Sequence, residues 1–317
     1  MLNKMAKNFI RSFILIVMLA NTNYYNNTYN PSFGAKNISI RKADKICRLV
    51  NKEFPMASST KMINYKSVYT TRQSKRFFEY IGDMIMNLRE YYFSNNEGET
   101  QIRMLMGLKK TKTGNCFEKA HATNVALKIN GYKDVNTVSL YAINNKTGEI
   151  RDLDHIVSAV NLGLPKDYHY WDGREKVTKE HFVTPNKKTI LLDSWAGVAD
   201  NITSMQANYK GNIRLSQKLE PNERLMFLPG KSFELSKEDI DYFKLKYPNL
   251  LLRQDKEFKI NRDLLNDSRY NLSEMSDNII RNVKQEHHIG AKNKPKNNHD
   301  EFWSTVMSIF SDPTTIF

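Results

Sequence analysis

Three side chains capable of thiol chemistry occur in one order along the chain: Cys116, then His155, then Asp193. A cysteine thiol is a weak nucleophile until a neighbouring base or a helix N-terminus favours its thiolate. A histidine can serve as that base, and an aspartate that accepts a hydrogen bond from one ring nitrogen leaves the other nitrogen facing the thiol. The three residues are therefore a candidate nucleophile, its base and the group that orients the base.

The segment around Cys116 favours a reactive thiol. Cys116 follows Gly114 and Asn115 and begins a predicted helix that runs to about Ile129. The first N–H groups of a helix are exposed and carry a partial positive charge, which stabilises a thiolate and can bind an oxyanion. Gly114 lets the backbone turn tightly before the nucleophile, and Asn115 could donate a side-chain hydrogen bond to a developing oxyanion.

His155 and Asp193 fall in predicted strands. His155 lies in the apolar segment Leu153–Val160, and Asp193 lies near the end of the segment Thr189–Trp195. A buried imidazole or carboxylate needs a hydrogen-bond partner. Because His155 lies 39 positions after Cys116 and Asp193 lies 38 positions after His155, the three side chains can meet if the two strands are neighbours.

Each residue also has a structural alternative. A cysteine at a helix start can be a small buried hydrophobe, a strand histidine can be a hydrogen-bonded core residue, and an aspartate can cap a turn. Asp152 and Asp154 flank His155 and compete with Asp193 as its partner, but side chains at adjacent strand positions point to the opposite face. We favour one site, because it explains all three residues together.

Three motifs resemble the transglutaminase-like branch of the papain-like cysteine enzymes. They are the helix start Gly114–Ala120 (GNCFEKA), the strand segment Asp154–Val157 (DHIV) and the strand end Leu192–Trp195 (LDSW). This superfamily includes transglutaminases, arylamine acetyltransferases, and secreted bacterial proteases and deamidases that act on host proteins. The resemblance covers about residues 110–200, under a third of the chain. It implies an α+β fold, with the cysteine at a helix N-terminus packed on an antiparallel sheet and helical regions flanking this core.

The resemblance also implies a role for each residue. Cys116 is the nucleophile, His155 the general base and acid, and Asp193 the residue that orients His155. Trp195 matches an aromatic residue often found just after this aspartate in related bacterial proteins, and we expect it to pack against the site. The chain departs from papain at Lys110, which stands where papain has a glutamine, and this leaves the oxyanion donor unassigned.

A site of this kind attacks an amide or ester carbonyl and forms an acyl-thioenzyme. Water as acceptor gives peptide cleavage or glutamine deamidation, an amine gives cross-linking, and another acceptor gives acyl transfer. We therefore expect a cysteine hydrolase or acyltransferase acting on a protein substrate, with a secreted bacterial protease or glutamine deamidase favoured and a host protein as its target. The alternative is an inactive protein of the same fold that docks on an acidic protein or an anionic membrane surface.

The overall composition indicates a folded, basic protein. The 317 residues include 48 Lys and Arg against 34 Asp and Glu, a formal net charge of +14, and 40% of the chain is hydrophobic. This charge favours acidic partners such as anionic membranes, nucleic acid or acidic proteins. We expect no specific nucleic acid as partner, because no nucleic-acid-binding module is recognisable.

The chain has two cysteines, which is too few for a disulfide framework. Cys47 lies in a predicted amphipathic helix and is expected to be a small buried hydrophobe. A Cys47–Cys116 disulfide is the rival interpretation for an exported protein. We expect no cofactor and no metal; a metal site is the weaker alternative for four residues near the C-terminus, Glu286, His287, His288 and His299.

The N-terminus has the pattern of an export signal. Basic residues precede an apolar run from Phe13 to Ala20, which is too short to span a bilayer as a helix. We assign residues 1–22 to a signal peptide, with a short buried or membrane-surface helix as the alternative, and residues 23–36 to a linker. The protein is accordingly expected to be secreted or exported.

The remaining chain is divided into a catalytic domain, residues 37–235, and a helical C-terminal extension, residues 236–317, with a disordered basic stretch near 289–300. Apolar residues at spacings of three and four predict a long helix over Gln73–Phe93. Further helices are predicted over Ser236–Tyr247 and Ser273–His287. We also expect a strand over Asn136–Ile143, a basic loop over Lys109–Gly114 and a long loop over residues 161–188.

Overall fold

The computed structural model describes residues 38–56, 72–92, 94, 96–165, 167–171, 177–211, 219–253, 261–267 and 273–287. The predicted signal peptide (1–22), the linker (23–36) and the basic stretch near 289–300 lie outside these ranges. Within them, no helix has the length and apolar character needed to cross a membrane.

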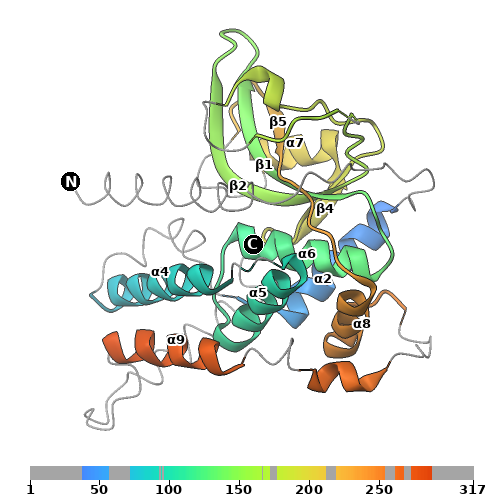
Figure 1. The fold of residues 1–317 in the computed structure, drawn as a ribbon. Coiled ribbons are helices and arrows are strands. Elements are labelled where there is room, and N and C mark those ends of the chain that lie inside the picture. The colour runs from blue at the N-terminus through green and yellow to red at the C-terminus, as the bar shows by residue number, and fades with distance from the viewer. Residues whose placement is uncertain are drawn as a thin grey trace.

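An antiparallel five-stranded sheet and seven α-helices make up the described fold, which is a mixed α and β structure (Figure 1). The three central strands, β1 (Val135–Asn144), β2 (Ile150–Val160) and β3 (Ile190–Asp193), lie where strands are predicted. The two edge strands, β4 (Val198–Asn201) and β5 (Glu223–Pro229), were not predicted from the sequence. The strand order across the sheet is β4, β3, β2, β1 and β5.

The helix α6 (Cys116–Ile129) lies against this sheet and is its main partner in the core. Only Phe117 of its fourteen residues is not buried. Alanines at three of its positions allow close approach to the strands, and the Ser158 hydroxyl of β2 donates a hydrogen bond to the Ala120 carbonyl over 2.9 Å. This bond joins the C-terminal part of β2 to the first turns of α6.

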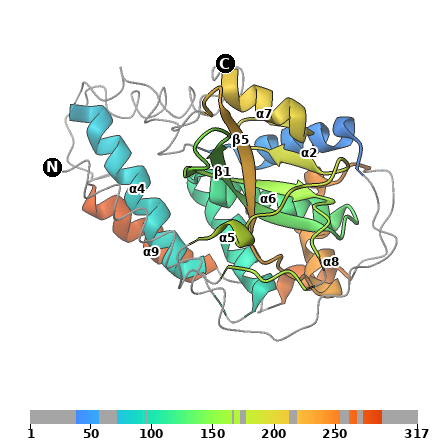
Figure 2. The same ribbon diagram turned by 90° about the horizontal axis from the view of Figure 1, so that it is seen from above.

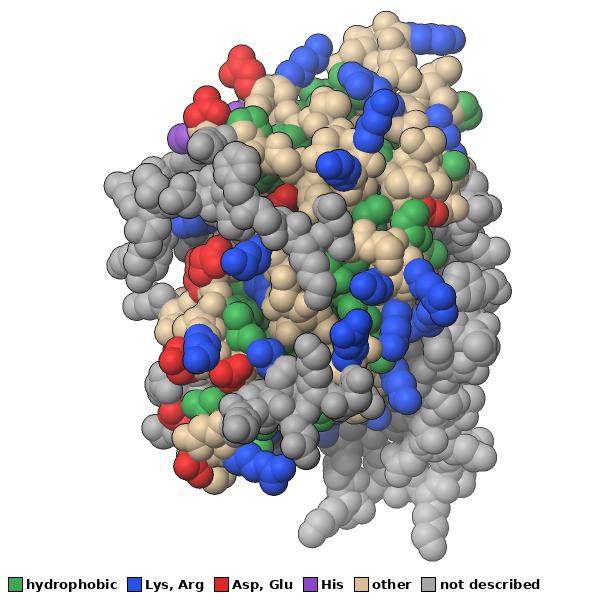
Figure 3. Space-filling model, turned by 90° about the vertical axis from the view of Figure 1, so that its right-hand side faces the viewer, with side chains coloured by type: hydrophobic (Ala, Val, Ile, Leu, Met, Phe, Trp, Pro, Cys, Tyr) green, Lys and Arg blue, Asp and Glu red, His purple; other side chains and the backbone are tan. Residues whose placement is uncertain are grey.

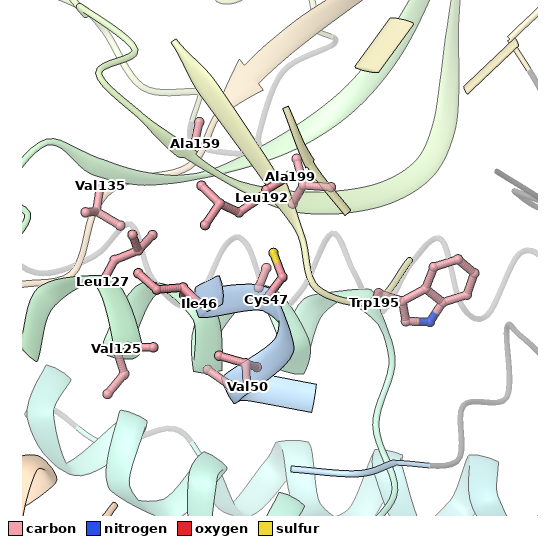
Figure 4. Close-up of a cluster of buried hydrophobic side chains, with 14 of the residues drawn as sticks. Ile46, Cys47, Val50, Val125, Leu127, Val135, Ala159, Leu192, Trp195 and Ala199 are labelled. Atoms are coloured by element: carbon pink, nitrogen blue, oxygen red, sulfur yellow. The ribbon is translucent and has the colours of Figure 1, made fainter. Parts of the chain in front are cut away.

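The helix α2 (Ile40–Glu53) packs beside α6 and covers the β3 and β4 end of the sheet. Figure 4 shows Ile46 and Cys47 of α2 between α6 and the strand residues Leu192 and Ala199. Cys47 is fully buried and is a free thiol, as predicted for a small core residue. Cys116 is also a free cysteine, so the structure contains no Cys47–Cys116 disulfide.

Three further helices form a layer beside this core: α4 (Arg72–Tyr92), α5 (Glu97–Thr111) and α9 (Ser273–Glu286). Helices α4 and α9 lie side by side in both ribbon views (Figures 1 and 2) and were predicted from the sequence. They share with α5 a second cluster of buried side chains: Met84, Leu88, Tyr91, Tyr92, Met104 and Val283.

The predicted basic loop over Lys109–Gly114 is wrong for its first three residues, which form the last turn of α5. The Asn96 side chain caps the start of α5 by accepting a 3.0 Å hydrogen bond from the Glu99 N–H. The basic residues that suggested a loop stand at the C-terminal end of the helix, where the helix dipole favours cations. The residue after the helix, its C-cap Lys112, has a left-handed φ of 52°.

The remaining elements lie in the C-terminal half of the chain. Helix α7 (Ile202–Gly211) follows β4, and α8 (Lys237–Lys246) begins at Ser236 with a capping box to Asp239, as the sequence predicts. Tyr242 of α8 shares one cluster of buried residues with α6. Short 3₁₀ helices occupy three ranges: η2 (Lys179–His181), η3 (Pro248–Leu250) and η4 (Arg262–Asn266).

Gly114, just before α6, is needed for close packing. A Cβ atom at this position would lie 2.7 Å from Leu108 Cδ2 and 3.0 Å from Met56 Sδ. Gly131, beyond the other end of α6, differs: its φ is 84°, and an added Cβ would have no neighbour within 4 Å. The two glycines therefore serve different purposes at the two ends of one helix.

We expect Gly114→Ala to lower the free energy of unfolding by about 1–3 kcal/mol, because it overpacks the start of α6. Gly131→Ala is the matched control, and its cost of about 1–2 kcal/mol comes from left-handed strain alone. Denaturant unfolding measures both losses, and alkylation of Cys116 reports on the helix start. Only Gly114→Ala should change the alkylation rate; equal rates in the two variants would contradict this account.

Candidate active site

Cys116 occupies the first position of α6 and is 9% exposed. Asn115 is the N-cap residue in an extended conformation, and its backbone N–H donates a 2.8 Å hydrogen bond to the carboxylate of Glu118, three residues on. A cap of this kind holds the first turn in place. The thiol therefore stands at a rigid helix N-terminus, where the helix dipole favours its thiolate.

A β-bulge in β2 sets the direction of His155. Leu140 of β1 pairs with His155, whereas the next residue, Tyr141, pairs with Asp152, so two residues of β2 are left over. One of them, Asp154, has a φ of 51°, and its N–H donates to the Asp152 carboxylate over 2.7 Å. A bulge re-aims the side chain beside it, and left-handed residues of this kind cluster at functional sites. The sequence pattern did not predict this irregularity.

Asp193 ends β3 and lies within reach of His155. Ser158 of β2 pairs with Leu192 of β3, and this antiparallel register puts Asp193 diagonally across from His155 on the same face. The imidazole Nε2–H donates to Asp193 Oδ2 over 2.7 Å, and both side chains are buried. Asp152, the competing carboxylate, is occupied within the bulge.

Two further donors hold the Asp193 carboxylate. The Tyr209 hydroxyl of α7 donates to Oδ2 over 2.8 Å, and the Ala196 N–H donates to Oδ1 over 2.9 Å. A buried carboxylate with three hydrogen-bond donors stays ionised and fixed in orientation. No sequence pattern points to Tyr209, because it lies in α7 (Ile202–Gly211), a helix that the sequence does not predict.

Aromatic rings enclose the imidazole. The Trp195 ring lies edge-on to His155 with 5.2 Å between ring centroids, and the Tyr209 ring lies 6.0 Å away. Trp195 therefore packs against the candidate site, as the resemblance implied. These rings keep water from the His155–Asp193 pair, which strengthens the electrostatic interaction between them.

The charges in the site favour a protonated imidazole. Burial alone would lower the pKa of His155, but the Asp193 carboxylate, the hydrogen bond to it and a hydrogen bond with Cys116 raise that pKa to about 10. Burial alone would raise the pKa of Asp193, and the charge of His155 and the surrounding donors lower it. With Nε2 committed to Asp193, the other ring nitrogen is the one left to interact with Cys116, so a thiolate and an imidazolium can form side by side.

Other residues named from the sequence lie elsewhere. Lys110, which stands in the sequence where papain has a glutamine, forms an ion pair with Asp277 of α9 over 2.9 Å. Among the described residues, no group of three or more His, Cys, Asp or Glu side chains could hold a metal. His287 instead hydrogen-bonds Asp83 over 2.8 Å, and the predicted partners His288 and His299 lie outside the described ranges.

Comparison with known proteins adds no relative. The chain matches no protein-family model, no curated protein and no solved structure. The candidate site therefore depends on its own geometry and on the three motifs.

We expect Asp193→Asn to remove a stabilising ion pair, at a cost of about 3–5 kcal/mol. The raised pKa of His155 stabilises the folded state fully at pH values below the histidine pKa of the unfolded chain, and the lowered pKa of Asp193 does so at pH values above the aspartate pKa of the unfolded chain. The loss of unfolding free energy in Asp193→Asn should therefore be largest between about pH 4 and 6.5. It should shrink as the pH rises through about 10, where His155 loses its proton in the folded state. Urea unfolding at a series of pH values tests this, and a loss that is constant from acid to alkaline pH would contradict it.

Tyr209→Phe should destabilise the protein by about 1–3 kcal/mol, because it removes a hydrogen bond to a buried charge. It should also slow alkylation of Cys116 severalfold, since Asp193 then holds His155 less firmly. Tyr247→Phe is the matched control, because Tyr247 is a buried tyrosine that packs on Phe54 away from the site. Equal alkylation rates in the two variants would show that Tyr209 has no role in the site.

Proposed function

We propose that this protein is a cysteine hydrolase or acyltransferase with a papain-like, transglutaminase-like catalytic core that acts on a protein substrate. The observation that carries the proposal is the buried 2.7 Å bond from His155 to Asp193, together with the electrostatic interaction of His155 with Cys116, a cysteine at a helix N-terminus. Each of the three side chains comes from a different element: α6, β2 and β3.

The geometry supports attack of the Cys116 thiolate on a carbonyl carbon. The tetrahedral oxyanion would lie at the start of α6, where backbone N–H groups can stabilise it. As the carbon–nitrogen bond breaks, the His155 imidazolium donates its proton to the departing amine or ammonia. An acyl-thioenzyme remains. His155 then takes a proton from the incoming water, which releases the acid and regenerates the thiolate.

We propose water as the acceptor, so that the reaction is peptide cleavage or glutamine deamidation rather than cross-linking. The support for this choice is the resemblance of the three motifs to secreted bacterial proteases and deamidases. The same resemblance and the export-like N-terminus support a host protein as the substrate and a secreted or exported location.

A second candidate is a binding protein with an inactive site that docks on an acidic protein or an anionic membrane. Its support is a row of exposed cations on one helix, and Lys and Arg side chains also gather on the face in Figure 3. The exposed cations of α2 are Arg41, Lys42, Lys45, Arg48 and Lys52. Basic surfaces attract anionic partners whether or not catalysis occurs nearby.

Incubation of the wild type and of Cys116→Ala with a host-cell lysate tests the choice between these functions. Mass spectrometry would identify new peptide termini, conversion of glutamine to glutamate, or cross-links. We expect one of the first two products with the wild type alone. If no change depends on Cys116, the binding protein is favoured.

We expect Cys116 to alkylate with iodoacetamide well below the ordinary thiol pKa of about 8.5. His155→Ala should slow the reaction at pH 6 by about tenfold or more, because the thiol returns toward that value. Cys47 is the internal control: burial raises the pKa of its thiol to about 12. His169→Ala, which changes an exposed loop histidine, is the matched variant and should react like the wild type. Equal rates in both variants would refute His155 as the base.

A further inference from the structure

A buried ion pair joins α4 to the first turn of α6. Arg89 Nε donates to Glu118 Oε1 over 2.5 Å and Arg89 Nη2 donates to Glu118 Oε2 over 3.0 Å. The two side chains are 8% and 1% exposed. The same carboxylate accepts the hydrogen bond from the backbone N–H of Asn115, the residue before Cys116. One carboxylate thus links Arg89 to the backbone beside the candidate nucleophile.

Glu118 has two opposing effects on this helix start. A carboxylate in the first turn caps the helix and interacts favourably with its dipole. A negative charge close to a thiol, however, disfavours the thiolate, and burial makes such an interaction stronger. Without a compensating cation, the cap would oppose the benefit that Cys116 gains from the helix N-terminus.

Arg89 is placed to supply that compensation. Its guanidinium group lies 5.2 Å from the centroid of the Phe117 ring, so Arg89 contacts two consecutive residues after Cys116. Phe117 also packs against both buried clusters, the one under the sheet and the one between α4 and α9. The layer formed by α4, α5 and α9 therefore brings a cation to the start of α6.

The other charged groups around Cys116 come from several elements. His155 faces it from β2, with Asp193 and the Tyr209 hydroxyl behind the imidazole. On α6 itself, Lys119 is buried and donates to the Phe54 carbonyl over 2.5 Å. Burial lowers the pKa of Arg89, but the Glu118 carboxylate and the hydrogen bond to it raise that pKa above its usual value, with a smaller contribution from Cys116. The ion pair and Cys116 therefore interact electrostatically.

We propose that Arg89 is a positioning residue for Cys116: it holds Glu118 as the cap of α6 and cancels its charge, so that the thiolate can form beside His155. This inference rests on the proposed role of Cys116 as nucleophile. It assigns the helical layer a part in the chemistry, although no residue of that layer belongs to the three motifs.

A four-protein comparison tests the proposal: wild type, Arg89→Met, Glu118→Gln, and the double variant. The rate of iodoacetamide alkylation at Cys116 is followed from acid to alkaline pH by mass spectrometry, with Cys47 as internal control. Arg89→Met should raise the midpoint of this pH–rate profile by about one pH unit, because the Glu118 carboxylate then remains without its cation. Glu118→Gln keeps an acceptor for Asn115 and should lower the midpoint, and the double variant should return close to the wild type.

A merely structural role of Arg89 would not shift the alkylation midpoint in opposite directions in the two single variants. Midpoints that shift in the same direction, or four equal midpoints that all lie below the ordinary thiol pKa, would overturn the role of Arg89 and leave the proposed function standing. An ordinary wild-type midpoint of about 8.5 would overturn both. If circular dichroism shows that Arg89→Met does not fold, Glu118→Gln and the double variant decide: the proposal requires a lowered midpoint in the first and its return in the second. Neutral replacements of a buried ion pair are often tolerated.

Discussion

The hydrogen bond between His155 and Asp193 is the interaction on which the rest of the candidate site depends. Both side chains are buried, and either one alone would be an expensive group to take out of water. In the pair, each side chain compensates the charge of the other. The Tyr209 hydroxyl and the Ala196 N–H donate two further hydrogen bonds to the carboxylate. The pair can therefore remain charged in the interior and still direct one imidazole nitrogen toward Cys116.

The fold delivers the thiol to this pair from the opposite layer. Cys116 begins a helix that packs on the sheet, while the bulge in β2 turns His155 toward that helix. Ser158 joins the two layers close to this point through the Ala120 carbonyl. The third layer acts through Arg89 and Glu118, which hold the helix start from the side away from the sheet. Elements α4, α6, β2 and β3 thus meet around Cys116.

Much of this could be predicted from the sequence, because local patterns determine local structure. Periodic apolar residues located α4 and α6, and the apolar segments around His155 and Asp193 located β2 and β3. Other features have no local signature. The bulge at Asp154 is a backbone irregularity, and the contact of Tyr209 with Asp193 depends on how α7 folds back on β3. Arg89 and Glu118 are 29 residues apart and meet only in the tertiary structure.

The proposed mechanism requires Asp193 to keep His155 protonated beside a thiolate at neutral pH. Nitrogen-15 NMR of the His155 ring measures this directly, with Cys116→Ala as the variant that removes the thiolate. We predict that both ring nitrogens of the wild type stay protonated from about pH 6 to about pH 8, and that the imidazole titrates at lower pH once the thiolate is removed. A wild-type His155 that titrates near the ordinary histidine value of about 6.5, unchanged in the variant, would contradict the account.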